Sequence, residues 1–152
     1  MTAVCLSGAL REAVEEVLEC MFFMQIDGPA GESGEAEELA AAQVDFEGSP
    51  SGTMRLRMSW GTACRVAADF LGEEESETPP ERTIDVMREF VNMICGAVLS
   101  RVESGSTFRL SAPVAGIESG EVACLPAEGV CCHVALPGGR LSVQLECGVL
   151  VG

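Results

Sequence analysis

Hydrophobic and polar positions follow a helical period in two long stretches of the chain. Between residues 78 and 102, apolar side chains recur every three or four positions and gather on one stripe: Ile84, Met87, Phe90, Val91, Ile94, Ala97 and Val98. Residues 8–26 repeat this spacing, with glutamates on the opposite side and an apolar set of Leu10, Val14, Val17, Leu18 and Met21. The pattern predicts two amphipathic helices, each with one face packed on a core.

The start of the later helix is marked by the run Thr78-Pro79-Pro80-Glu81. In a capping box the threonine hydroxyl accepts from a first-turn amide, and the glutamate reaches back to the cap. The prolines stand where a missing backbone N–H costs nothing. We therefore expect Thr78 to cap this helix.

Several other segments alternate apolar and polar residues with a period of two, which is typical of half-buried strands. The clearest candidates form two hairpins, 43–47 with 53–60 and 130–136 with 140–150, and shorter candidates lie at 107–110, 113–117 and 122–125. Residues 62–71 predict a short helix ended by Gly72, residues 27–36 a mobile loop, and residues 73–77 a solvated acidic linker. These elements predict one α+β domain over residues 1–152, with two long helices packed on one face of a largely antiparallel sheet.

The polar side of the 78–102 helix carries a candidate working surface. Asp85, Glu89, Asn92 and Gly96 are spaced so that they share a sector roughly 60° wide opposite the apolar stripe. Glycine costs about 1 kcal/mol in a helix interior relative to alanine, and asparagine is also a poor helix former. Two interpretations remain open on spacing alone, namely an ordinary solvated face and a surface that a partner approaches closely.

The net charge of the chain argues against two classes of partner, nucleic acids and membranes. Nine basic against 24 acidic residues give a net charge of −15, which repels nucleic-acid phosphates and anionic lipid surfaces. The start of the sequence does not resemble a secretion signal, and no apolar run approaches the length of a membrane span. We expect a cytoplasmic protein whose partner is neither a nucleic acid nor a membrane.

The eight cysteines form no C-x-x-C pair, and several stand in apolar runs where a small hydrophobic residue fits. Cys131 and Cys132 are adjacent in a predicted strand, so their side chains point to opposite faces, and His133 is the single histidine. We expect reduced structural thiols and no metal site. A redox or metal protein built on these cysteines is a weaker alternative.

The polar ridge also resembles a known family. Asp85-x3-Glu89-x2-Asn92, followed about twenty residues later by Pro113 in FRLSAP, is similar to the signature of the CheC/CheX/FliY phosphatases of bacterial chemotaxis, as is the surrounding VNMICGAVLSR. The resemblance implies dephosphorylation of a phospho-aspartyl, CheY-like response regulator. It implies that Asn92 orients the attacking water and that Glu89 docks on the regulator, with Asp85 and Gly96 at the contact. The Mg²⁺ would belong to the regulator, so the chain would need no cofactor of its own.

The earlier helix distinguishes between branches of that family. Applying the family's internal repeat places Glu16-Val-Leu-Glu19 where the later helix has Glu89-Phe-Val-Asn92, and Phe23 where it has Gly96. A second motif is therefore absent, which resembles the single-motif CheX type. By this resemblance, and from the apolar end VLVG, we expect a homodimer formed through an exposed strand. The alternative function is a noncatalytic CheX-like adaptor that binds a signalling protein.

Overall fold

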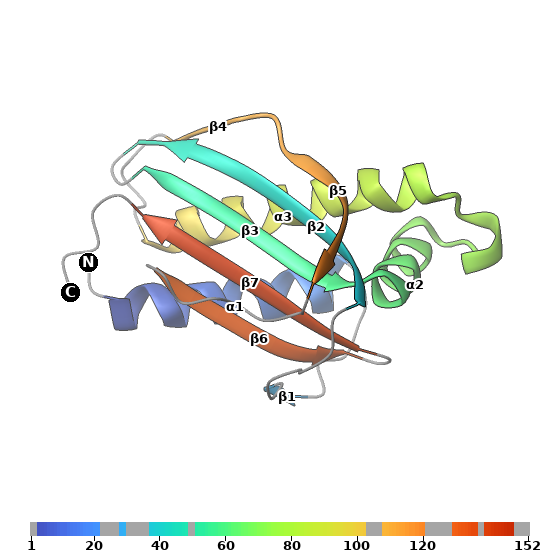
Figure 1. Cartoon of the computed structure of the whole chain (residues 1–152). Coiled ribbons are helices and arrows are strands. Elements are labelled where there is room, and N and C mark those ends of the chain that lie inside the picture. The colour runs from blue at the N-terminus through green and yellow to red at the C-terminus, as the bar shows by residue number, and fades with distance from the viewer. Residues whose placement is uncertain are drawn as a thin grey trace.

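A computed structural model describes residues 3–21, 28–29, 37–48, 51–102, 108–120, 129–136 and 139–147. Its centre is one antiparallel sheet in the order β1-β6-β7-β3-β2-β4, and β5 also pairs with β2 (Figure 1). The strands are β1 (Gly28–Pro29), β2 (Glu37–Glu47), β3 (Gly52–Ser59), β4 (Arg109–Leu110), β5 (Val114–Gly120), β6 (Val130–Leu136) and β7 (Gly139–Cys147). The two predicted hairpins are confirmed as β2–β3 and β6–β7, and β3 joins them by pairing with β7.

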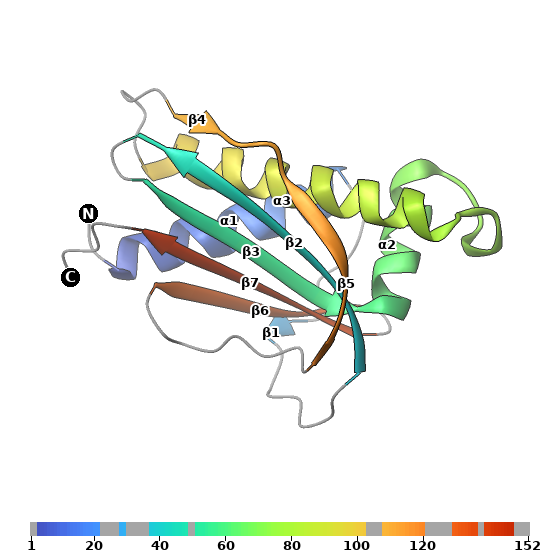
Figure 2. The same cartoon turned by 45° about the horizontal axis from the view of Figure 1, so that its top comes forward.

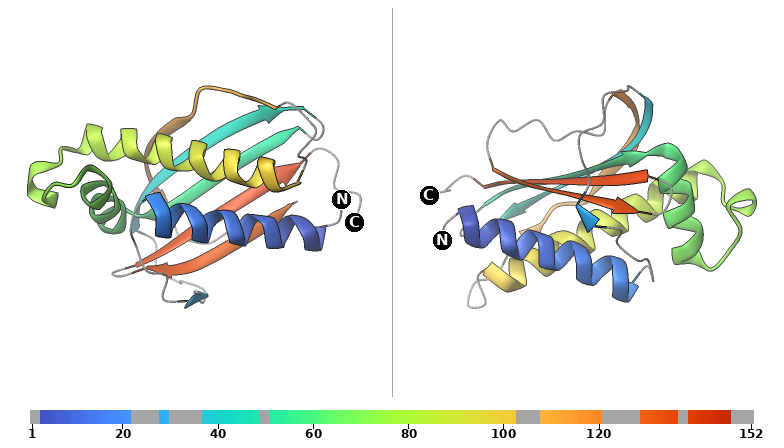
Figure 3. Two further views of the ribbon diagram at one scale, coloured as in Figure 1. Left: turned by 180° about the vertical axis from the view of Figure 1, so that it is seen from behind. Right: turned by 90° about the horizontal axis from the view of Figure 1, so that it is seen from below.

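Two long helices, α1 (Ala3–Met21) and α3 (Pro80–Val102), lie side by side and antiparallel on the same face of the sheet (Figure 3). Arg101 near the end of α3 forms ion pairs with Glu12 and Glu16 of α1. The shorter α2 (Trp60–Leu71) lies beside the first half of α3 at one end of the sheet (Figure 2), and a 3-10 turn, η1 (Glu75–Glu77), leads from it towards α3. The predicted fold class is confirmed.

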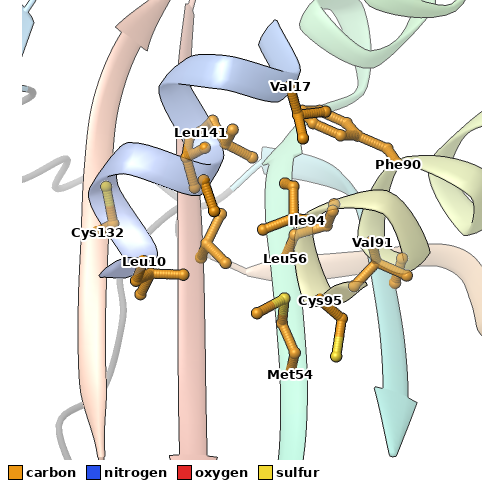
Figure 4. Close-up of a cluster of buried hydrophobic side chains, with 14 of the residues drawn as sticks. Leu10, Val17, Met54, Leu56, Phe90, Val91, Ile94, Cys95, Cys132 and Leu141 are labelled. Atoms are coloured by element: carbon orange, nitrogen blue, oxygen red, sulfur yellow. The ribbon is translucent and has the colours of Figure 1, made fainter. Parts of the chain in front are cut away.

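The hydrophobic core lies between this helix pair and the sheet, as the close-up in Figure 4 shows. Strands β3 and β6 alternate buried and half-buried residues, so the period-two pattern in the sequence matches their two faces. Leu10 and Val17 from α1 meet Phe90 and Ile94 from α3 above Leu56 and Leu141 of the sheet, and all six are buried. This packing fixes the rotation of α3 about its axis, and with it the direction in which its polar ridge points.

Two glycines determine where α2 ends and how closely it packs. Gly72 ends the helix in the left-handed conformation at φ 69°, and its N–H donates to the Asp69 carbonyl, as predicted for a helix stop. A Cβ on Gly139 at the start of β7 would lie 1.9 Å from Thr62 Oγ1 of α2. The missing side chain therefore lets α2 pack directly on the β6–β7 hairpin.

The predicted capping box at the start of α3 is wrong. Pro79 supplies the carbonyl that accepts from the first helical amides, those of Arg82 at 3.0 Å and Thr83 at 3.2 Å. The Thr78 hydroxyl instead donates backwards, to the Glu74 carbonyl at 3.0 Å and the Glu73 carboxylate at 3.2 Å. Thr78 precedes two consecutive prolines and has an extended backbone, with φ −104° and ψ 104°, so the helix begins beyond it and its hydroxyl bonds to the segment before it.

Other boundaries differ from the sequence predictions. Helix α1 is described from Ala3 to Met21, so it begins ahead of the predicted residue 8, and the predicted stretch 22–26 lies outside the described residues. Strand β2 begins at Glu37 instead of 43. Residues 28–29, expected in a mobile loop, form β1 against β6. The predicted strand 122–125 and the remainder of the 27–36 loop lie outside the described residues.

The expectation of reduced thiols is wrong for Cys131, which is disulfide-bonded to a cysteine outside the described side chains. Cys20, Cys64, Cys95 and Cys132 form no disulfide. Cys131 and Cys132 do point to opposite faces of β6, with Cys132 buried in the core. Burial raises the pKa of the Cys132 thiol and that of the Cys64 thiol above the ordinary value, which keeps both protonated and poorly nucleophilic.

Candidate active site on helix α3

The outward side of α3 carries the predicted polar ridge. Asp85, Glu89 and Gly96 are exposed and Asn92 is half-buried, while Phe90, Val91 and Ile94 on the other side are buried. One helix therefore serves two purposes, because its apolar stripe anchors it on the sheet and its ridge projects away from the core. The core packing holds the ridge residues on a rigid backbone, which favours a site that depends on accurate positioning.

The carboxylates of the ridge differ in their neighbours. Asp85 forms an ion pair with Arg88, one turn along the same helix. Glu89, in contrast, makes no ion pair or hydrogen bond with any other described residue, and neither does the Asn92 amide. Two polar groups on one face, free of intramolecular partners within the described chain, are available to an incoming molecule.

The resemblance leaves two roles open for Asp85, support of the side of Glu89 and contact with the rim of the partner. Its carboxylate is engaged by Arg88, and its side chain is 66% exposed. At the rim of the ridge such a paired carboxylate can still meet a partner, but it is partly neutralised. Both roles stay predictions.

Gly96 leaves open space beside Asn92. A Cβ built on Gly96 would meet no atom within 4 Å, so the surrounding structure does not require a glycine here. The helix nonetheless carries its cost of about 1 kcal/mol relative to alanine. Packing within the chain gives no reason for this residue, and a close approach from outside does.

The acidic run before α3 is more than a solvated linker. Glu73 is only 20% exposed at its side chain and forms an ion pair with Arg82 at 2.9 Å. This pair ties the segment after α2 to the first turn of α3. The same ion pair holds Arg82 at the edge of a surface feature that no sequence pattern reveals.

That feature is a hollow of about 260 Å³ between the end of α2 and the first half of α3, lined by Phe70, Leu71, Arg82, Asp85, Val86 and Glu89. Its apolar lining comes from both helices, and its polar rim includes two residues of the ridge. Periodicity within one helix could not have revealed it, because the hollow exists only once α2 is placed against α3.

Pro113, the downstream proline of the family signature, lies directly before β5 and is half-buried. Strand β5 contacts α3, which places this segment on the same side of the molecule as the ridge helix. Within the described ranges, no three His, Cys, Asp or Glu side chains gather closely enough to hold a metal ion. In that same part of the chain, no helix is long and apolar enough to cross a membrane.

Comparison with known families identifies this arrangement. The model of the family described as Chemotaxis phosphatase CheX matches residues 40–134, which is more than half of the chain and includes the whole of α3. The chain belongs to the CheX family. No curated protein is significantly similar to it in sequence.

Solved structures of CheX proteins share the fold over almost the whole chain. The chemotaxis protein CheX from Vibrio vulnificus gives a TM-score of 0.74 at 18% identity, covering 97% of this chain and 99% of that one. CheX from Desulfovibrio desulfuricans gives 0.73 at 20% identity, covering 93% and 98%. A CheX-CheY-BeF3-Mg complex from Borrelia burgdorferi gives 0.67 at 22% identity, covering 92% and 96%. The chain thus has the fold of a chemotaxis phosphatase, while the roles of Glu89 and Asn92 stay predictions.

Proposed function

We propose that this CheX-family chain hydrolyses the aspartyl phosphate of a CheY-like response regulator. The observation that carries the proposal is the pair Glu89 and Asn92, exposed or half-buried on one face of a rigid helix with no partner among the described residues. The same two residues complete the motif that resembles the family signature. The Borrelia burgdorferi relative was solved as a CheX-CheY complex, which supports a regulator of this class as the partner.

In the proposed reaction Asn92 enters the regulator's site, and its side-chain oxygen accepts a hydrogen bond from a water molecule. The oriented water attacks phosphorus in line with the bond to the regulator's aspartate. The new oxygen–phosphorus bond forms as the aspartyl–phosphorus bond breaks, which leaves a free carboxylate and inorganic phosphate. The amide takes no proton, so its contribution is positioning.

Glu89 is proposed to dock the complex. Its free carboxylate can pair with a cationic side chain of the regulator and hold Asn92 in register, and the bond would be charge-assisted and shielded from water once docked. Asp85 and Gly96 flank this contact, the first at the rim and the second as the open space beside Asn92. The chain supplies no metal in this scheme, because the Mg²⁺ that neutralises phosphoryl charge would sit in the regulator.

Replacement of Asn92 by alanine tests the proposal. The decay of radiolabelled phospho-regulator should slow by about 10²–10³-fold in kcat, because one transition-state contact is lost while docking is not. Binding to the regulator carrying BeF3⁻ and Mg²⁺ should be unchanged. Ser100→Ala, at an exposed position two turns further along α3, is the matched control and should leave both quantities at the level of the unmodified protein.

Two outcomes would contradict the proposal. Full activity of Asn92→Ala would remove Asn92 from the catalytic role. If the unmodified protein accelerates the decay of no regulator but still binds one, the noncatalytic adaptor becomes the better interpretation.

Self-association is a further part of the proposal. Strand β7 is an interior strand between β6 and β3, and residues 148–152 lie outside the described residues. Among the described strands, β5 lies at one edge of the sheet, and its Val114 is 61% and Ile117 is 49% exposed. We therefore assign the expected homodimer contact to β5, within a cytoplasmic protein that acts as one domain. Sedimentation that shows only monomer well above micromolar concentration would contradict it.

A further inference from the structure

The hollow beside Glu89 suggests how the regulator is selected. Three of its lining residues, Phe70, Leu71 and Val86, are apolar. Phe70 and Leu71 pack on the core with one side and remain partly exposed on the other. Arg82, Asp85 and Glu89 complete the lining with charged groups, so an apolar recess is bordered by polar side chains. Recesses of this kind, desolvated and ringed by polar groups, are where the energetically dominant contacts of protein interfaces concentrate.

The position of the hollow determines what covers it. Asp85 and Glu89 line the hollow and precede Asn92 by seven and three residues on the same side of α3, which is about 10 Å and 5 Å along a helix. A specific protein interface buries about 800 Å² on each partner, equivalent to a disc of roughly 16 Å radius. A protein docked with Asn92 near the centre of its contact therefore extends over the rim of the hollow.

Charge and shape define the contact further. Arg82 is held at the rim by Glu73 and Asp85 by Arg88, so neither needs the partner to be neutralised. Glu89 is the rim group that has no ion-pair partner among the described residues. An apolar side chain can enter the recess while a neighbouring cation on the same surface meets Glu89.

From these observations, and resting on the proposed function, we propose that the hollow between α2 and α3 receives one apolar side chain of the response regulator and thereby contributes to regulator specificity. The predicted surface of the regulator carries a large apolar residue near the cation that pairs with Glu89. Leu71 and Phe70 are then binding residues that act on recognition and leave the chemical step unaffected.

The test compares Leu71→Ser with Leu71→Met, which keeps the apolar volume. Leu71→Ser should raise KM for the phospho-regulator about tenfold and leave kcat within about twofold, because a contact made equally in ground and transition states is lost. It should weaken binding of the regulator loaded with BeF3⁻ and Mg²⁺ by the same factor. Leu71→Met should match the unmodified protein, and thermal melting followed by circular dichroism checks that each variant is folded.

Two further controls sharpen the interpretation. Ser7→Ala changes an exposed side chain on α1, and because that residue does not line the hollow, its kinetics should not change. The loss caused by Leu71→Ser should persist at high salt, whereas the loss caused by Glu89→Gln should shrink as salt screens the charge contact. Equal KM values for Leu71→Ser and the unmodified protein, or an equal loss in Ser7→Ala, would overturn the proposal.

The two proposals fail in different ways. If no phosphatase activity is found but the loaded regulator binds, the proposed reaction is wrong, and the hollow is still tested by the dissociation constants alone. A weaker complex with Leu71→Ser then supports the hollow, and an unchanged one overturns it. If activity is normal in every variant at position 71, the reaction stands and the hollow has no part in recognition.

Discussion

Helices α1 and α3 lie next to each other on the same face of the sheet, yet their outward sides are equipped differently. In the repeat that the resemblance implies, Glu16 of α1 corresponds to Glu89 of α3, but Glu16 is joined to Arg101 by an ion pair. Glu19 of α1 corresponds to Asn92, and Phe23, which corresponds to Gly96, lies outside the described residues. The shared packing thus says little about function. One substitution, of Asn92 by Glu19, and one ion pair, between Glu16 and Arg101, separate a candidate site from a supporting helix.

The difference between α1 and α3 is tested most directly by replacing Glu89 and Glu16 one at a time. Glu89→Ala should weaken the complex with the BeF3⁻-loaded regulator by roughly 2–5 kcal/mol, because a charge pair that becomes desolvated on docking loses one partner. Glu16→Ala should leave regulator binding unchanged, because its carboxylate is directed to Arg101. Isothermal titration calorimetry of both variants against the same regulator measures the difference.

Concentration separates binding from catalysis in the same pair. A high concentration of regulator should restore much of the rate of Glu89→Ala, whereas it should not restore Asn92→Ala. Equal losses in Glu89→Ala and Glu16→Ala would show that the two helices contribute alike and that the distinction drawn from ion pairing is wrong.

Gly96 provides the next test, with a smaller effect in the opposite direction. Gly96→Ala should raise the free energy of unfolding by about 0.5–1 kcal/mol, since the added methyl meets open space and alanine is the better helix former. Urea denaturation measures this gain. Gly96→Phe, which introduces a large ring, should fold but raise KM because the ring fills the space beside Asn92. A stable Gly96→Phe variant with normal kinetics would show that no partner approaches this face closely.

The fold and most of the ridge could be predicted from sequence because both depend on local periodicity. The spacing of Phe90, Val91 and Ile94 sets which side of α3 is buried, and the opposite placement of Glu89 and Asn92 follows from helix geometry alone. The hairpins were likewise found from alternation within each strand. Their order in the sheet, with β3 pairing with β7, required the structure.

What could not be predicted depends on contacts between distant segments. The hollow needs Phe70 of α2 beside Val86 of α3, and no pattern within either helix encodes their separation. The engagement of Glu16 depends on where Arg101 lies, 85 residues from Glu16 in the chain. Local reasoning also failed at Thr78, because a capping box describes residue types and spacing but not the path that two prolines impose on the chain.

The smallest expected effect concerns Arg101 itself. Its side chain is 27% exposed, but its partners Glu12 and Glu16 are 72% and 52% exposed, so solvent screens both pairs. Arg101→Ala should lower the free energy of unfolding by about 0.2–1 kcal/mol, with part of the loss coming from the bond to the Ala97 carbonyl at 2.9 Å. The difference in urea midpoint between Arg101→Ala and the unmodified protein should narrow at 1 M salt, where the screening length falls to about 3 Å. Arg109→Ala, at an exposed position on β4, is the matched control.

Arg101→Ala also frees Glu16, which tests whether ion pairing alone prevents α1 from acting as a site. Because Glu19 corresponds to Asn92 in the implied repeat, a carboxylate would stand where the water-orienting amide is needed. The variant should therefore gain no phosphatase activity in the background of Asn92→Ala, and any gain there would show that pairing of Glu16 is what distinguishes the two helices.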